Sequence, residues 1–199
     1  EEKPVIDKTV GDLENKYLSA GVGTKITWYL QATVPYDVKG YKTFVMKDTF
    51  EPGLTVDDGN GAARGNVVVK HGTGTNFNDG NAYKELTIVT DYVLGGTGQD
   101  VIITFTETGI KKLAAGDNVV ASIDTFINKK AVMGADIPNN FTLNYGHEPN
   151  STKEPNEIPE NKRPKVVTGG KKFKKVIEGT ETALEDAVFK LRDDQTDVK

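Results

Sequence analysis

The chain has 199 residues, of which 36% are hydrophobic and 27% charged, and this length is sufficient for one full domain and part of another. A formal net charge of −4 gives no basis for a nucleic-acid partner. No apolar stretch approaches the roughly 18 residues of a membrane span, and no signal peptide or sorting tail is present, so we expect a fragment that does not insert into a membrane. The chain contains no cysteine, so a covalent cross-link would have to be something other than a disulfide.

Short runs rich in Val, Ile, Thr and aromatic residues, separated by clusters of Gly and Asn that favour turns, predict an all-β sandwich. The predicted strands are 3–10, 25–34, 42–50, 65–70, 83–90, 99–106, 118–128 and 139–145. One short helix is predicted at 107–115, where Gly116 stops it.

The second part of the chain differs in composition. Residues 146–164 hold four prolines and almost nothing apolar, which predicts a stiff linker. We therefore predict a first sandwich domain at 1–148, a proline-rich linker at 149–164, and the N-terminal part of a second β-sandwich domain at 165–199, with strands at 166–177 and 183–191. Two strands cannot close a sandwich, so the second domain is incomplete in this sequence.

Three polar residues, Lys8, Asp48 and Asn139, occupy positions where the strand pattern predicts burial. Each alternates at a spacing of two with large apolar side chains, and residues two apart in a strand share a face. A lysine buried without a partner costs far more free energy than one strand returns, so an inward lysine is either paired or neutral and reactive. The competing interpretations are that Lys8 snorkels from an edge strand and that Asp48 caps a turn.

Several asparagines compete for the third position. Asn140 and Asn144 fall on the strand face opposite to Phe141, so parity favours Asn139, and Asn128 remains the alternative.

Other polar residues predict no metal or cofactor site. Asp57 and Asp58 lie in a stretch typical of a hairpin turn, and its spacing does not fit a calcium loop. His71 and His147 are isolated in the sequence, so neither a zinc site nor a catalytic triad has its parts. We expect no cofactor and no enzymatic turnover of a substrate.

Three motifs in a fixed order resemble a known family. They are KDTFEPGLTV at 47–56, IPNNFTLNYGHEPN at 137–150, and TGGKKFKKV followed by LEDAVFKL within 168–191. Together they resemble the backbone, or major, pilins that sortases polymerise on Gram-positive bacteria. The resemblance implies immunoglobulin-like sandwiches of the collagen-adhesin type, each able to form a Lys–Asn isopeptide bond with the help of a nearby acid.

Carried over to this sequence, the resemblance implies a cross-link between Lys8 and Asn139, with Asp48 as the catalyst. The neutral amine of Lys8 would attack the carboxamide of Asn139, while protonated Asp48 would hydrogen-bond the amide oxygen and move a proton to the departing ammonia. Lys175 matches the reactive lysine of the second domain, whose partners would lie beyond Lys199.

The resemblance also implies an extracellular, cell wall-anchored pilus in which sortase joins neighbouring pilin subunits covalently. The polymerisation lysine would lie before the first strand, outside this sequence. The alternative function is a surface adhesin of similar build that binds a host matrix protein or glycan.

Overall fold

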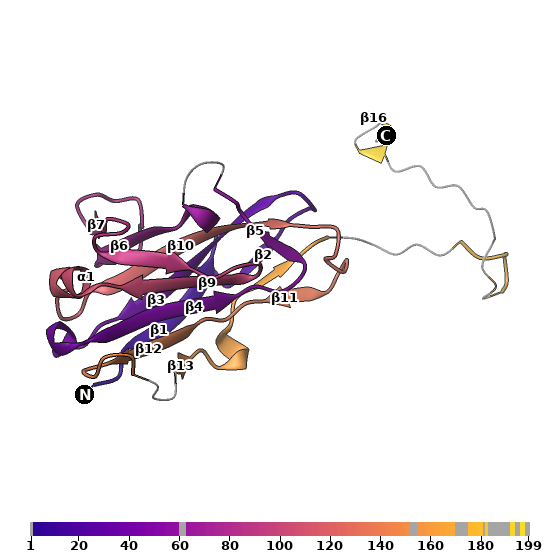
Figure 1. The fold of residues 1–199 in the computed structure, drawn as a ribbon. Helices are drawn as coiled ribbons and strands as arrows, with labels where there is room; N and C mark the ends of the chain where they lie inside the picture. Colours follow the sequence, from indigo (N-terminus) through magenta and orange to yellow (C-terminus); the bar gives the residue numbers. More distant parts are fainter. Residues whose placement is uncertain are drawn as a thin grey trace. The chain divides into compact units, whose positions relative to one another are not determined.

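The computed structural model describes residues 2–59, 63–151, 155–169, 175–180, 182, 192–193 and 196–197. The chain forms two compact units, Glu1–Gly169 and Gly170–Lys199. In the described part of the second unit, β15 (Arg192–Asp193) and β16 (Thr196–Asp197) pair antiparallel. The first unit contains the strands that form the site described below (Figure 1).

One layer of the first unit is an antiparallel sheet in the order β1-β3-β10-β6-β7, with β5 also paired to β10. Its strands are β1 (Val5–Val10), β3 (Lys25–Thr33), β5 (Leu54–Val56), β6 (Val68–Gly72), β7 (Tyr83–Glu85) and β10 (Asn118–Ile127). Along β3 the side chains of Ile26, Trp28, Leu30 and Ala32 are buried, as their spacing of two predicts. Thus β1 lies at one edge of this sheet.

The second layer is an antiparallel sheet in the order β13-β12-β4-β9-β8. Its strands are β4 (Thr43–Thr49), β8 (Tyr92–Gly95), β9 (Asp100–Phe105), β12 (Thr142–Gly146) and β13 (Asn156–Glu157). Phe44, Met46 and Leu143 from this layer belong to the same core cluster as Trp28 and Leu30 of the other layer. The fold is therefore a β-sandwich whose two layers share an apolar core, and the predicted all-β class is confirmed.

The described residues of the first unit also form three short helical segments and one α-helix. The segments are η1 (Val38–Gly40), η2 (Arg64–Asn66) and η3 (Glu160–Lys162). The helix α1 (Glu107–Lys112) starts where the Thr106 side chain accepts a hydrogen bond from the Gly109 N–H, and ends three residues earlier than predicted because Leu113 is extended. No described helix is both long and apolar enough to cross a membrane.

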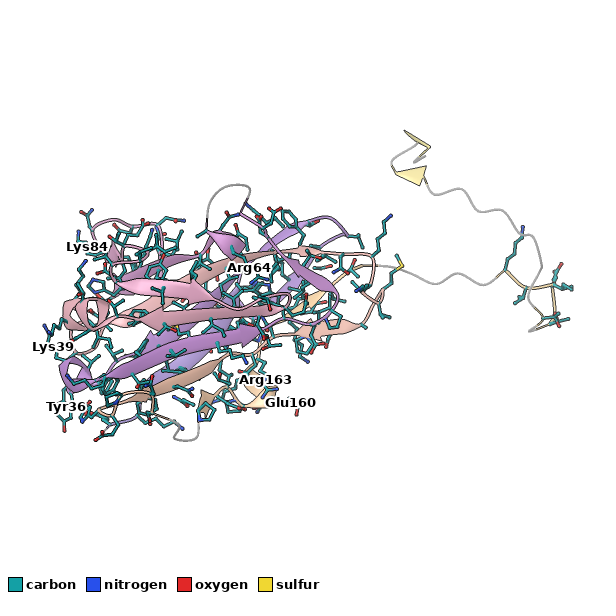
Figure 2. The ribbon with its side chains drawn as sticks, in the orientation of Figure 1. Tyr36, Lys39, Arg64, Lys84, Glu160 and Arg163 are labelled. Atoms are coloured by element: carbon teal, nitrogen blue, oxygen red, sulfur yellow. The ribbon has the colours of Figure 1, made fainter. Side chains whose placement is uncertain are left out.

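A third, three-stranded sheet joins the two layers at one edge. It has the order β11-β14-β2, in which β14 (Lys165–Val167) pairs antiparallel with β11 (Asp136–Pro138) and parallel with β2 (Tyr17–Ser19). Since β2 follows β1 and β11 precedes β12, strand β14 links a segment that follows the first layer's edge strand to a segment that leads into the second layer. We call residues 155–169, which contain β13, η3 and β14, the strap; Figure 2 labels Glu160 and Arg163 on it.

The strap differs from the predicted organisation. The predicted boundary lies at residue 148 and the predicted linker at 149–164, whereas the structure divides the chain between Gly169 and Gly170. The reason is that Ile158 and Val166 are 2% and 0% exposed and pack into the core, so the proline-rich stretch is held against the sandwich. Within the rest of the predicted second domain, residues 170–174, 181, 183–191, 194–195 and 198–199 lie outside the described residues, and with them the strand predicted at 183–191.

The strands predicted within 1–148 overlap strands of the structure, although the one predicted at 83–90 ends at Glu85 and β2, β5, β8 and β11 were not predicted. One further difference concerns the site. The prediction places Asn139 at the start of a strand at 139–145. In the structure Asn139 lies between β11 and β12, because the chain crosses there from the three-stranded sheet to the second layer. Its side chain is nevertheless buried, as parity predicts.

Candidate functional site

Three buried polar side chains meet between the two layers of the sandwich. Lys8 comes from β1, where it lies opposite Leu30 of β3, and Asp48 comes from β4 in the other layer. Asn139 comes from the segment that joins β11 to β12. The residues are 0%, 0% and 3% exposed respectively, so the structure brings together the three side chains that the sequence predicts.

The three side chains are linked by hydrogen bonds. The Nζ of Lys8 donates to Oδ2 of Asp48 and, at 3.1 Å, to the main-chain oxygen of Asn140. The Nδ2 of Asn139 donates to the same Asp48 oxygen at 3.4 Å, and its Oδ1 accepts from the main-chain N–H of Asn140 at 3.0 Å. The mechanism implied by the resemblance has Asp48 bonded to the amide oxygen, whereas here Asp48 faces the amide nitrogen.

Aromatic rings surround the amine. The Nζ of Lys8 lies 5.5 Å from the ring centroid of Trp28 and 5.1 Å from that of Phe50. The second oxygen of Asp48, Oδ1, is buried and makes no hydrogen bond in the described part of the chain. An apolar environment with few polar partners penalises the charged forms of both groups.

The pKa values of the pair move toward each other. Burial lowers the pKa of Lys8 from 10.5 to about 8, although the Asp48 carboxylate acts in the opposite direction. Burial also raises the pKa of Asp48 from 3.8 to about 6, against the opposing effect of Lys8 and the hydrogen bond from Asn139. The two pKa values therefore differ by about 2 units instead of about 7, and the neutral amine and neutral acid coexist far more often than in water.

The side chains of two competing asparagines, Asn128 and Asn140, make their hydrogen bonds outside this cluster. Asn128 donates its side-chain N–H groups to the main-chain oxygen of Pro52 and the hydroxyl of Thr55, both at 2.9 Å. Asn140 contributes main-chain groups to the cluster, while its side-chain oxygen accepts from the N–H of Ile158 at 3.3 Å. The sequence could not predict this contribution of Asn140, because the alternation of apolar residues indicates where side chains point and not what the main-chain groups bind.

Lys175 lies in the second unit and is exposed. No contact in the described part of the chain tests its cross-linking role, which stays a prediction.

The other polar residues considered from the sequence have structural partners. Asp57 accepts a hydrogen bond from the N–H of Gly59 at 2.9 Å, as in a turn. His71 pairs with Asp117 at 2.8 Å, and His147 lies 3.1 Å from Asp37. Among the described residues there is no group of three or more His, Asp or Glu side chains that could hold a metal ion.

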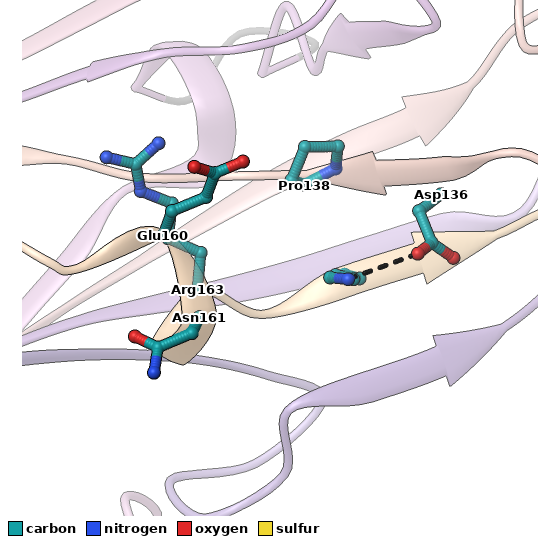
Figure 3. Close-up of a pocket in the computed structure, with 6 residues that line it drawn as sticks. Asp136, Pro138, Glu160, Asn161 and Arg163 are labelled. Atoms are coloured by element: carbon teal, nitrogen blue, oxygen red, sulfur yellow. Dashed lines mark hydrogen bonds and ion pairs between the residues drawn. The ribbon is translucent and has the colours of Figure 1, made fainter.

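A surface pocket of about 620 Å³ lies between the strap and β11 (Figure 3). It is lined by Asp136, Pro138, Glu160, Asn161, Arg163 and Lys165. An ion pair of 3.2 Å joins Lys165 to Asp136 inside this set, so the charges largely compensate one another. None of the three cluster residues lines the pocket, and the cluster itself is closed to solvent.

Comparisons with known proteins agree with this architecture. No family model matches the chain. The chain is 28% identical over 173 residues to the fimbrial subunit type 2 of Actinomyces naeslundii, an alignment that covers 80% of this chain and 28% of that protein. The chain thus spans less than a third of this relative.

Solved structures of pilins share the fold. The 35 kDa C-terminal fragment of the major pilin of Streptococcus agalactiae matches with a TM-score of 0.66 at 24% identity, covering 92% of this chain and 62% of that one. The major pilin subunit of Bacillus cereus matches with a TM-score of 0.63 at 20% identity, covering 84% of this chain and 41% of that one. The predicted resemblance to the backbone pilins of Gram-positive bacteria is therefore confirmed, together with the β-sandwich fold that it implies.

Proposed function

We propose that this chain is part of a structural subunit of a pilus shaft, and that its first unit is locked by a self-formed isopeptide bond between Lys8 and Asn139. The observation that carries the proposal is a fully buried lysine and acid in contact with a buried asparagine, inside a sandwich similar to those of major pilins. A buried ion pair adds little net stability to a core, because desolvation offsets the attraction. A reactive role accounts for these residue types better than a stabilising role does.

The reaction begins with transfer of a proton from the Lys8 ammonium to the Asp48 carboxylate. The neutral amine then attacks Cγ of Asn139, and a new C–N bond forms as the carbonyl oxygen takes up the electron pair. When the intermediate collapses, the Cγ–Nδ2 bond breaks. Asp48 gives its proton to the departing nitrogen and takes the surplus proton from Nζ, so one ammonia leaves and one amide bond forms.

The position of Asp48 suits this role. Its Oδ2 contacts both the attacking nitrogen of Lys8 and the departing nitrogen of Asn139, so a single carboxyl group serves both proton transfers. The fold holds the reactants together, and proximity of this kind contributes about 7 kcal/mol or more to lowering the barrier in favourable intramolecular reactions. The bond would form once per molecule, without turnover of any substrate.

The cross-link would give the unit a defined load path. Tension applied to the chain ends would pass from Lys8 directly to Asn139 and leave the strands between them unloaded. Closing a loop of about 130 residues would also stabilise the unit by about 5 kcal/mol, by analogy with disulfides. Both properties suit an extracellular shaft in which sortase joins neighbouring subunits on the cell wall.

A surface adhesin remains the second candidate, because the fold does not separate the two functions. The N-terminal domain of a Streptococcus gordonii adhesin matches this chain with a TM-score of 0.56 at 15% identity. A shaft subunit, expressed at full length with its sortase, should form covalent ladders that resist boiling in detergent. Saturable binding of the monomer to immobilised host matrix protein or glycan, without ladders, would favour the adhesin.

The bond itself is tested with an isosteric variant. We expect the purified folded chain to be lighter than its sequence by one ammonia, and the Asn139→Asp chain to lose one water instead of ammonia or to stay unlinked. The Lys8→Met chain should keep its full mass. If the Lys8→Met chain showed the same deficit as the parent chain, the deficit would come from another site and the assignment would be wrong.

A further inference from the structure

The side-chain oxygen of Asn139, Oδ1, accepts a hydrogen bond that has no part in the proton transfers of Asp48. When the amine attacks, negative charge develops on Oδ1, because this atom takes the electron pair of the C–O double bond. The main-chain N–H of Asn140 donates to this atom at 3.0 Å. Donors aimed at the place where charge develops lower the barrier most when they are fixed before the reaction and shielded from water.

We propose that the main-chain N–H of Asn140 is the oxyanion donor of the cross-linking reaction, an inference that rests on the proposed function. The assignment of atoms in the cluster supports it. Asp48 faces the nitrogen of the Asn139 amide and serves the departing group, which leaves the oxygen for a different donor. In the described part of the chain, the Asn140 N–H has that position.

The peptide group of Asn140 also orients the nucleophile. Its carbonyl oxygen accepts a hydrogen bond from Nζ of Lys8 at 3.1 Å, while Asp48 binds the same Nζ. One residue therefore fixes both reacting groups through its main chain, holding the oxygen of Asn139 on its N–H and the amine of Lys8 on its carbonyl. Both contacts are made by main-chain atoms, so the side chain of residue 140 takes no direct part in them.

The strap holds this dipeptide in place from outside. The N–H of Asn139 donates to the carbonyl oxygen of Pro164 at 3.1 Å, and the side-chain oxygen of Asn140 accepts from the N–H of Ile158 at 3.3 Å. Ile158 is 2% exposed, and its side chain belongs to the core. The donor is thus fixed by packed structure before the reaction starts, as electrostatic preorganisation requires.

Lys16 fastens the strap to the strand that carries the nucleophile. Its Nζ donates to the main-chain oxygen of Lys8 at 2.6 Å and to that of Lys162 on the strap at 2.8 Å. Asp7, which precedes Lys8 in β1, forms an ion pair with the same Lys16 ammonium. These contacts keep β1 and the strap together on the side of the sandwich where Lys8 and Asn139 meet.

The test removes the N–H while keeping the side chain. Two chains are made by cell-free synthesis: Asn140→Ala with its normal amide, and the same variant with lactic acid at position 140, which replaces the main-chain N–H by an ester oxygen. Both are folded by dilution from denaturant, and the loss of ammonia is followed by intact mass. Fluorescence of Trp28, the single tryptophan and a fully buried one, reports folding independently.

We expect the ester chain to fold but to form the bond about 10²- to 10³-fold more slowly than its amide control, as for other single oxyanion donors. Equal rates in the two chains would overturn the inference and leave the cross-link intact. Absence of ammonia loss in the parent chain would instead overturn the proposed function and the inference together.

A second measurement avoids the ester. Hydrogen exchange at the Asn140 N–H is compared in the Lys8→Met chain, which cannot form the bond, and in the Lys8→Met/Asn139→Ala chain. Slow exchange in the first and at least tenfold faster exchange in the second would show that the Asn139 oxygen is the acceptor. The same rate in both chains would contradict the assignment.

Discussion

The rate of bond formation should depend on pH in a way that the buried pair determines. The reactive state has a neutral Lys8 and a neutral Asp48, so the pair holds one proton, and that proton sits on the acid. The pair loses this proton above the pKa of Lys8, about 8, and gains a second one below the pKa of Asp48, about 6. We therefore expect a rate plateau between about pH 6 and 8, with a fall of about tenfold per unit well outside it.

The magnitude on the plateau follows from the two pKa values. A separation of about 2 units corresponds to about 3 kcal/mol, so the neutral pair makes up ~1% of the molecules. With the ordinary values of 10.5 and 3.8, the cost would be about 9 kcal/mol. Burial thus raises the fraction of molecules with a neutral Lys8 and a neutral Asp48 by roughly 10⁴- to 10⁵-fold. We regard this increase as the main contribution of the apolar environment, which includes Trp28 and Phe50, to the reaction rate.

The assay starts from unlinked protein. The chain is purified unfolded in denaturant, diluted into buffers from pH 4 to 10, quenched at intervals, and weighed by intact mass spectrometry. Trp28 fluorescence verifies at each pH that folding is complete before the bond forms. The Lys8→Met chain is the control for ammonia lost elsewhere.

Two pH profiles would contradict a reaction that needs both groups neutral. A rate that rises up to about pH 8 and then stays constant would mean that the amine alone must be neutral, and that Asp48 acts only as a base. A rate that does not change between pH 4 and 10 would mean that neither group titrates in the rate-limiting state.

Further predictions concern the catalyst, the unlinked state and the load path. The Asp48→Ala chain should fold and keep its full mass, because no group then moves protons between the two nitrogens; ammonia loss at the parental rate would remove Asp48 from the mechanism. The Asn139→Ala chain should be less stable than the linked chain by about 5 kcal/mol in guanidinium unfolding, and a difference below about 1 kcal/mol would contradict the loop-closure estimate. In that unlinked chain the pKa of Lys8 is lower in the folded state, so between pH 8 and 10.5 only the unfolded state keeps the lysine proton and the free energy of unfolding should rise by about 3 kcal/mol. The pKa of Asp48 is higher in the folded state, so as the pH falls from 6 to 3.8 the folded state alone takes up a proton and the free energy of unfolding should again rise by about 3 kcal/mol. The control is Lys8→Met/Asp48→Leu, which should lack this minimum near neutral pH, and a minimum of equal depth in the control would assign it to other groups. In force spectroscopy, the linked first unit pulled by its ends should lengthen by about 100 Å, because only residues 140–169 can extend. The Asn139→Ala unit should lengthen by roughly 550 Å, and equal lengths for the two would show that no bond joins Lys8 to Asn139.

The burial of the core residues and of the three cluster residues could be predicted from alternation, whereas their meeting in one cluster was implied by the resemblance. Lys8 shares a face with Val10, and Asp48 shares one with Met46, because side chains in a strand repeat every two residues. The same rule selected Asn139 over Asn140 even though the segment is not in a regular strand. A pattern of this kind identifies which side chains point inward without knowledge of the partner strands.

The strap could not be predicted in this way. Its stretch of prolines and charged residues has too few apolar positions to show a period. The burial of Val166 depends on pairing with β11 and β2, and β2 is far away in the sequence. Short strands that pair on both sides leave little local signal. The composition therefore indicated a linker where tertiary contacts hold the chain.

The orientation of the Asn139 amide was also beyond the sequence. Parity places the side chain inside but does not say which amide atom meets Asp48, because the answer depends on the main chain of Asn140. The Asn140 N–H can be identified as the donor to Asn139 only when the path of the main chain between β11 and β12 is known.

The intact mass of the folded, purified chain tests the central claim most directly. We expect a mass lower than that of the sequence by one ammonia, with the deficit located by digestion in a peptide that joins Lys8 to Asn139. A full, unmodified mass in folded protein would contradict the account, since the buried cluster would then be a non-reactive ion pair in an ordinary sandwich.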